Sequence, residues 1–215
     1  MADDAGSQGD HYFTARPASA DERRELPVTL AGRDVVVETA PGIFSPGHVD
    51  LGTAVLLRTV PTPPEGTLLD LGCGWGPIAL TMALLRPESR IWAVDVNERA
   101  LDLVRRNAER LALIAPLGEV IAARPDEVPA NLAFDALWSN PPVRVGKDAL
   151  HALLAEWLPR VKPGAEAHLV VQRHLGADSL APWIAEQRDD AGLPWGRVER
   201  VASAKGFRVL RMART

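Results

Sequence analysis

Hydrophobic and polar positions follow two periodicities that alternate along most of the chain. Short apolar runs, typical of buried strands, are followed by segments whose apolar residues recur every three or four positions, as in amphipathic helices. The apolar runs predict strands at residues 67–72, 90–96, 118–123, 134–139 and 165–172. The helical pattern predicts helices at residues 77–85, 97–113, 148–158 and 177–187. This alternation predicts a mainly parallel sheet with helices on both faces.

The N-terminal part of the chain follows a different pattern. Two β-like runs in residues 26–39 flank Gly32, which predicts a hairpin. A loop follows, and we expect a helix from about Asp50. The segment PTPPEG at residues 61–66 predicts a stiff connector between this part and the regular strands and helices.

The C-terminal segment, residues 196–213, predicts two strands joined by a turn near Lys205 and Gly206, and such a pair must be antiparallel. We therefore expect an α/β fold with a mostly parallel, doubly wound sheet and an antiparallel C-terminal strand pair. The expected organisation is a disordered tail at residues 1–10, an N-terminal extension packed on the core at residues 11–60, and one large domain at residues 61–215.

Composition narrows the classes of partner. The chain has 215 residues and a net charge of −4, with 24 basic against 28 acidic side chains. This balance argues against a general nucleic-acid coat protein but leaves room for a local basic face. The single cysteine, Cys73, excludes an intramolecular disulfide and a cysteine-rich metal site. We expect no metal, no signal peptide and no membrane span, and hence a cytoplasmic protein.

A glycine-rich turn is the first candidate binding element. In the stretch LLDLGCGWGPIAL, residues 68–80, Gly72, Gly74 and Gly76 alternate after a predicted strand. Small residues let the backbone approach a ligand closely, and ligands of such sheets bind at the carboxyl ends of the strands. A simple tight turn would need only one or two glycines. The three together favour a ligand-binding turn.

Two acidic residues indicate which ligand the turn takes. Asp70 lies two residues before the first glycine, where it would repel a pyrophosphate but suit a positive group. Asp95 ends the next strand, where a carboxylate can accept both hydroxyls of a ribose. S-Adenosylmethionine carries an ammonium, a sulfonium and a ribose, so it fits both positions. The alternative is that Asp70 caps the turn and Asp95 caps the following helix.

Three sequence motifs are similar to motifs of known enzymes. DLGCGWG at residues 70–76 and VDVN at residues 94–97 resemble the first two motifs of class I S-adenosylmethionine-dependent methyltransferases. NPPV at residues 140–143 resembles the Asn-Pro-Pro motif of enzymes that methylate planar nitrogens.

The resemblance extends over residues 11–213 through HYFTARPAS, GIFSPGHVDLGT, SNPPVRVGKDALH and FRVL. These segments are similar to short, single-domain members of the small-ribosomal-subunit RNA guanine-N2 methyltransferase family. The resemblance implies a Rossmann-like seven-stranded sheet, the cofactor S-adenosylmethionine, and methyl transfer to the exocyclic amine of a nucleobase, above all guanine N2 of ribosomal RNA. It also implies an RNA partner, bound through a local basic face.

The residue patterns and the resemblance together predict three groups of site residues. The expected catalytic residues are Asn140, Pro141 and Pro142. The expected cofactor-binding residues are Asp70, Gly72, Cys73, Gly74, Gly76, Asp95, Val96, Asn97 and Asn140. The expected substrate-binding residues are Phe44, Val143, Arg144 and Lys147. Many family members have an aromatic residue where this chain has Val143, so stacking on the base would either be weaker or fall to another residue, for which Phe44 and Tyr12 are the candidates.

The Asn-Pro-Pro segment suggests how an amine is methylated. The lone pair of an exocyclic amine is delocalised into its ring, so the amine needs acceptors for its two N–H groups. The side-chain carbonyl of Asn140 can accept one, and the backbone carbonyl of Pro141 can accept the other. The two prolines hold these acceptors in place, so little reorganisation is needed in the transition state.

Other functions remain open at this point. The same chemistry could act on a protein glutamine, an adenine in DNA or a transfer RNA base. An inert cofactor-fold assembly protein is a second class, and intact Asp70, Asp95 and Asn140 argue against it. A nicotinamide-dependent oxidoreductase is a third, which the glycine pattern disfavours. The target nucleotide, the number of methyl groups and the oligomeric state stay open.

Overall fold

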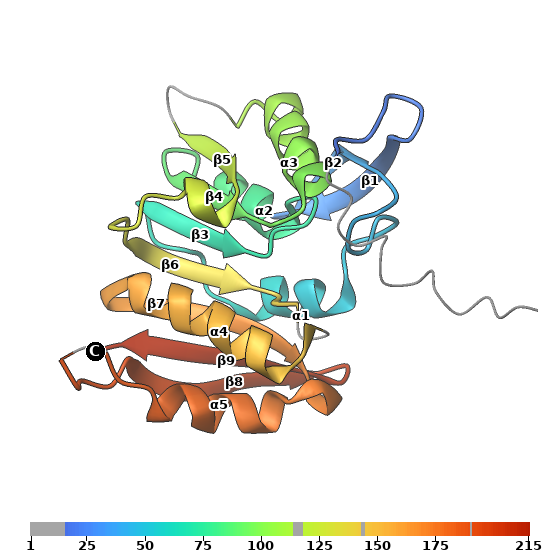
Figure 1. Cartoon of the computed structure of the whole chain (residues 1–215). Coiled ribbons are helices and arrows are strands. Elements are labelled where there is room, and N and C mark those ends of the chain that lie inside the picture. The colour runs from blue at the N-terminus through green and yellow to red at the C-terminus, as the bar shows by residue number, and fades with distance from the viewer. Residues whose placement is uncertain (1–15, 114–117, 143–144, 190) are drawn as a thin grey trace, which may run out of the picture.

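The computed structural model describes residues 16–113, 118–142, 145–189 and 191–215. A two-stranded hairpin, β1 (Arg24–Leu30) and β2 (Arg33–Thr39), precedes a large sheet with helices on both faces (Figure 1). The large sheet consists of β3 (Thr67–Leu71), β4 (Arg90–Val94), β5 (Glu119–Ala123), β6 (Phe134–Ser139), β7 (Val161–Gln172), β8 (Gly196–Ala204) and β9 (Phe207–Arg214). The α-helices are α1 (Leu51–Thr59), α2 (Pro77–Leu85), α3 (Glu98–Arg110), α4 (Lys147–Trp157) and α5 (Ala177–Glu186). The expected tail at residues 1–10, Tyr12, Val143 and Arg144 lie outside the described residues.

The large sheet has the strand order β5-β4-β3-β6-β7-β9-β8. β9 is antiparallel to both of its neighbours, and the other pairs are parallel. The predicted α/β fold, with seven strands and an antiparallel C-terminal pair, is confirmed. The largest difference in a boundary is at β7, which begins at Val161, four residues before the predicted start, because Val161 pairs with Phe134 before Pro163 and Gly164 interrupt the ladder. The helix predicted at residues 97–113 ends earlier, at Arg110, and the strand predicted at residues 90–96 ends at Val94.

Helices cover the two faces of the sheet as two separate layers. On one face, α4 and α5 pack their buried Leu154 and Ile184 against a core that includes Leu69 of β3. On the other face, α1, α2 and α3 pack against a core that includes Leu68. Adjacent residues of β3 thus point into different cores, as the period of a strand requires. No helix in the described part of the chain is long and apolar enough to span a membrane.

The N-terminal hairpin packs on α2 and α3, while α1 packs on β7 and β9. A buried asparagine of α3, Asn107, connects the hairpin to the core. Its Oδ1 accepts the backbone N–H of Glu38 at 2.6 Å, and its Nδ2 donates to the carbonyls of Glu38 and Trp75 at 3.0 and 3.2 Å. One side chain thus holds β2, α3 and the glycine-rich turn together. The expected division at residue 61 stays a prediction.

We predict that Asn107→Ala lowers the free energy of unfolding by about 2–4 kcal/mol, because it leaves buried backbone groups without partners. Urea denaturation followed by circular dichroism measures this change. Glu109→Ala, an exposed substitution on the same helix, is the matched control and should change stability by no more than about 0.5 kcal/mol. Equal effects of the two substitutions would contradict the proposed role of Asn107.

Candidate functional site

The register of the sheet places the site. Leu71 at the end of β3 pairs with Val94 of β4 on one side and with Ser139 of β6 on the other. The next residue of each strand therefore leaves the sheet at the same edge. Those residues are Gly72, Asp95 and Asn140. The hydroxyl of Ser139 donates to the carbonyl of Leu71 at 2.6 Å and holds two of these ends together.

The glycine-rich turn after β3 has a backbone that favours glycine. Gly72, Gly74 and Gly76 have φ angles of 75°, 54° and 95°, in the left-handed region where a side chain is strained. The N–H groups of Gly72 and Cys73 donate to the carbonyl of Val94 at 2.8 and 3.0 Å, which folds the turn over the end of β4. A Cβ atom on Gly72 would lie 3.7 Å from Cδ of Pro142, so the turn lies beside the Asn-Pro-Pro segment.

Asp70 is a fully buried carboxyl beneath this turn. Its Oδ2 accepts the N–H of Ala79 at 2.9 Å, and its Oδ1 has no hydrogen-bond partner among the described residues. Burial, with a smaller contribution from the nearby charge of Asp95, raises the pKa of Asp70 to about 8, although the hydrogen bond from Ala79 opposes the shift. A buried oxygen without a donor is suited to a positively charged or hydrogen-bond-donating ligand.

Asp95 connects the turn to the end of β4. Its Oδ2 accepts the N–H of Gly74 and its Oδ1 accepts the N–H of Asn97, both at 2.9 Å. Burial raises the pKa of Asp95, although these hydrogen bonds oppose the shift. The side chain of Asn97 caps α3 by accepting from Arg99 and donates to the carbonyl of Gly42 at 3.0 Å. Asn97 therefore connects the start of α3 to the loop before α1 by hydrogen bonds.

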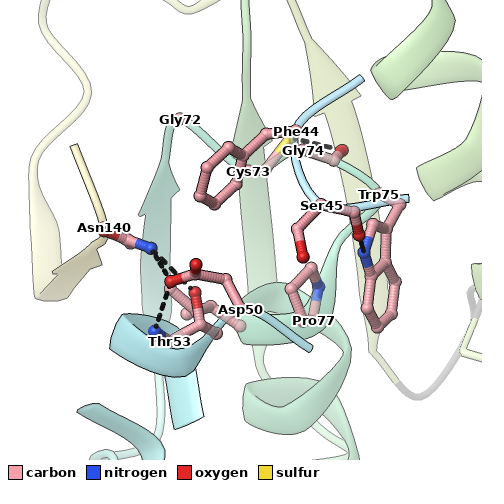
Figure 2. A pocket seen from close by; sticks show the side chains of 11 residues that line it. Phe44, Ser45, Asp50, Thr53, Gly72, Cys73, Gly74, Trp75, Pro77 and Asn140 are labelled. Atoms are coloured by element: carbon pink, nitrogen blue, oxygen red, sulfur yellow. Dashed lines mark hydrogen bonds between the residues drawn. The ribbon is translucent and has the colours of Figure 1, made fainter. Parts of the chain in front are cut away.

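Asn140 follows β6 and points toward the start of α1 (Figure 2). Its Nδ2 donates to Oδ2 of Asp50 at 2.9 Å and to the hydroxyl of Thr53 at 3.0 Å. Both amide hydrogens are therefore directed to the protein. The oxygen of the amide is the group left to accept a hydrogen bond from a ligand.

A pocket lies between the glycine-rich turn, the Asn-Pro-Pro segment and the loop before α1 (Figure 2). It is lined by Phe44, Ser45, Asp50, Thr53, Gly72, Cys73, Gly74, Trp75, Pro77, Ile78 and Asn140. The pocket thus brings together five of the predicted site residues. The other described predictions do not line it: Asp70, Gly76, Asp95, Val96, Asn97, Pro141, Pro142 and Lys147. Their binding roles stay predictions.

Sequence reasoning missed Asp50, Thr53 and Ser45 as residues of the site. Asp50 and Thr53 hold Asn140, and the carbonyl of Ser45 accepts the indole N–H of Trp75 at 3.3 Å. All three lie in GIFSPGHVDLGT, a segment singled out only for its resemblance. The resemblance of that segment to the family indicated that it is important, but it did not indicate which residues its side chains contact. Cys73, also in the pocket, is buried, which raises the pKa of its thiol.

The family model named methyltransferase small domain matches residues 34–211, and the chain belongs to this family. The predicted class, an S-adenosylmethionine-dependent methyltransferase, is thereby confirmed. The chain is 29% identical over 206 residues to the uncharacterized protein YbxB of Bacillus subtilis, covering 94% of this chain and 97% of that protein.

Two further similarities concern longer proteins. The chain is 34% identical over 213 residues to ribosomal RNA small subunit methyltransferase C of Pseudomonas entomophila, covering 95% of this chain and 58% of that one. The structure of the T. thermophilus 16S rRNA N2 G1207 methyltransferase, solved with S-adenosylmethionine and guanosine, matches with a TM-score of 0.76 and 22% identity. That match covers 93% of this chain and 52% of the other, and it supports the fold. The chain spans about half the length of these methyltransferases.

The buried carboxyl of Asp70 generates a prediction about pH. The folded state keeps the proton up to about pH 8, whereas the unfolded chain loses it near the ordinary value of 3.8. The folded state therefore binds more protons in this range, and Asp70 makes the free energy of unfolding fall as pH rises.

We therefore predict that Asp70→Asn becomes progressively more stable than wild type as pH rises from about 4 to about 8. Urea denaturation of the cofactor-free protein at several pH values across this range measures the difference. Asp148→Asn, which changes an exposed carboxyl at the start of α4, is the control. A stability difference between Asp70→Asn and wild type that does not vary with pH would contradict the assignment.

Proposed function

We propose that this protein transfers the methyl group of S-adenosylmethionine to the exocyclic N2 amine of a guanine in small-subunit ribosomal RNA. One observation carries the proposal: the amide of Asn140 presents its oxygen, at the edge of a pocket lined by the glycine-rich turn. The names of the relatives support the choice of RNA and of the guanine amine. We expect the reaction to take place in the cytoplasm.

The residues at the ends of β3 and β4 fit the cofactor. A Cβ atom on Gly74 would meet no atom within 4 Å, and one on Gly72 would meet only Pro142 and Asn140, so these two glycines leave room for a ligand against the backbone. A Cβ atom on Gly76 would press on Val104 instead, so that glycine serves core packing. The partnerless oxygen of Asp70 suits the positive groups of S-adenosylmethionine. The two carboxylate oxygens of Asp95 have about four lone-pair sites, and backbone N–H groups occupy only part of them, which leaves acceptor capacity for ribose hydroxyls. Val96 is 54% exposed beside it and offers an apolar contact to an adenine ring. When bound, the cofactor supplies a methyl group on a sulfonium, which is a good leaving group.

The chain's own residues then hold the amine. Asn140 Oδ1 accepts one N–H of the amine and the Pro141 carbonyl accepts the other, so the lone pair of the nitrogen is directed away from both. Pro141 and Pro142 keep this segment rigid, and the acceptors need no rearrangement as positive charge develops on nitrogen. A well-aligned nucleophile beside an activated methyl group needs no strong base. The C–S bond breaks as the C–N bond forms, S-adenosylhomocysteine leaves as a neutral thioether, and the methylated amine, which is acidic while it carries the extra proton, releases that proton to water.

Two exposed residues fit a substrate role. The ring of Phe44 is 43% exposed at the pocket, where it can stack on an unpaired base (Figure 2). Lys147 is exposed at the first position of α4, within reach of a phosphate near the Asn-Pro-Pro segment. Val143 and Arg144 lie outside the described residues, and their roles stay predictions.

Methyl transfer from labelled S-adenosylmethionine tests the proposed function. The protein is incubated separately with undermethylated small subunits, large subunits, transfer RNA, and ribosomal proteins with release factors. Nuclease digestion then identifies the modified nucleoside. We expect N2-methylguanosine in the small-subunit pool. Label confined to transfer RNA or to protein would overturn the ribosomal assignment, and no label in any pool would overturn the proposed activity.

We predict that Asn140→Ala lowers kcat by roughly 10²–10³-fold, because it removes one preorganised acceptor. The affinity for S-adenosylmethionine, measured by isothermal titration calorimetry, should stay within about tenfold of wild type. Asn131→Ala removes an exposed asparagine before β6 and serves as the matched control. Unchanged turnover of Asn140→Ala would contradict the mechanism.

We predict that Asp95→Ala weakens cofactor binding at least about tenfold, the loss expected when a charged acceptor of two hydroxyls is removed. The same calorimetric titration gives the change in Kd. Asp95 also accepts hydrogen bonds that hold the glycine-rich turn, so its loss can disturb the turn itself. Asp95→Asn, which keeps a side chain of the same size, is therefore measured in parallel. If Asp95→Ala binds S-adenosylmethionine with the affinity of wild type, the ribose does not bind at Asp95.

A further inference from the structure

One oxygen of Asp50 serves two structural tasks at once. Its Oδ2 accepts the N–H groups of Gly52 and Thr53 at 2.7 and 3.1 Å, which caps the first turn of α1. The same oxygen accepts the amide of Asn140 at 2.9 Å. The start of α1 is thus connected to the Asn-Pro-Pro segment, which lies 90 residues further along the chain.

The chemistry of this contact fixes the orientation of the Asn140 amide. An ionised carboxylate can only accept hydrogen bonds, so it pairs with the NH₂ of the amide and repels its oxygen. If the amide turned over, Oδ1 of Asn140 would face Oδ2 of Asp50, and a hydrogen bond to charge would be replaced by repulsion. The hydroxyl of Thr53 accepts the second amide hydrogen and so adds a second contact that holds the amide in this orientation, while Asp50, which can only accept, selects it.

Packing holds Asp50 in place. Thr53 is 3% exposed, and α1 lies on β7 and β9. Gly52 has no room for a side chain: a Cβ atom there would lie 2.8 Å from the ring of Phe207 and 3.0 Å from Oδ2 of Asp50. The carboxylate therefore lies between a tightly packed helix start and the Asn140 amide (Figure 2). Asp50 itself is partly exposed at the pocket, and its hydrogen bonds to the packed start of α1 set its position.

We propose that Asp50 and Thr53 are positioning residues that hold the Asn140 amide with its oxygen toward the substrate. This inference rests on the proposed function of Asn140 as the acceptor for the target amine. It has a consequence for specificity. A fixed acceptor stabilises a nitrogen that carries hydrogens, and it repels a keto oxygen or an unprotonated ring nitrogen in the same place. The Asp50–Thr53–Asn140 group thus makes the site favour nitrogens that carry hydrogen, such as the exocyclic amine of guanine, over keto oxygens and unprotonated ring nitrogens.

Three substitutions of Asp50 separate positioning from helix capping. Serine and asparagine both cap helices well, but serine is too short to reach Asn140, whereas asparagine keeps an acceptor at the same distance. We expect Asp50→Ser to lower kcat at least about tenfold, with KM for S-adenosylmethionine changed less than about threefold. Asp50→Asn should recover most of the loss, and Asp50→Ala should be no better than Asp50→Ser. Equal turnover in Asp50→Ser and Asp50→Asn would show that only the cap matters and would overturn the proposal.

Thr53 provides a second comparison. Thr53→Val removes the acceptor while keeping the shape of the side chain, and Thr53→Ser keeps the acceptor. We expect kcat to fall about threefold to tenfold in Thr53→Val and to stay closer to wild type in Thr53→Ser. Valine and serine variants with the same kcat would remove Thr53 from the proposal.

Nuclear magnetic resonance of the cofactor-free protein gives a readout that does not depend on activity. The side-chain amide signals of Asn140 are identified by their loss in Asn140→Ala. We expect hydrogen exchange at this amide to be at least about tenfold slower in wild type than in Asp50→Ser, while the backbone amide of Thr53 stays protected in both. Exchange at the same rate in both proteins would overturn the inferred contact.

These measurements distinguish the failure of this inference from the failure of the proposed function. A wild-type protein that methylates no guanine overturns the proposed function, and the exchange of the Asn140 amide still decides whether Asp50 holds it. An active wild type with an equally active Asp50→Ser variant overturns this inference alone.

Discussion

β3 pairs in parallel with β4 on one side and with β6 on the other, and the candidate site depends on that arrangement. The register aligns the last residues of the three strands, so that Gly72, Asp95 and Asn140 leave the sheet side by side. Parallel strands with helical connections place all their carboxyl ends at one edge. The glycine-rich turn after β3 and the Asn-Pro-Pro segment after β6 therefore lie side by side, although they are far apart in the sequence.

Three carboxylates near this edge differ in what surrounds them. Asp70 is buried with one oxygen unpaired, and burial raises its pKa to about 8. Asp95 accepts backbone hydrogen bonds from Asn97, Gly74 and Val96, which partly offset the effect of its burial. Asp50 lies at the start of α1 and accepts three hydrogen bonds on one oxygen. The surroundings, more than the residue type, decide which carboxylate is left for a ligand and which one orients another side chain.

Much of the fold could be predicted from local patterns. Helix α2 has its predicted bounds, because its proline start and the apolar run that follows are both local signals. The start of β7 was wrong, because it depends on pairing with Phe134, a residue distant in sequence. The glycine-rich turn was predictable for the same reason as α2: positive φ angles leave a trace in the sequence as glycines.

The partners of Asn140 could not be predicted in this way. Asp50 and Thr53 carry signals of a helix start, and nothing in their spacing indicates that they also contact a side chain 90 residues away. Such contacts follow from the register of β6 and from the packing of α1 on β7 and β9. The segment that contains both residues resembles a family motif, but only the three-dimensional structure shows that both residues contact Asn140.

The most direct test of the account is a crystal structure of the protein with S-adenosylhomocysteine and guanosine. The account predicts that Nδ2 of Asn140 still donates to Asp50, and that Oδ1 of Asn140 lies within hydrogen-bond distance, about 3 Å, of the guanine N2 amine. An amide turned over in the complex, or a guanine amine bound away from Asn140, would contradict it.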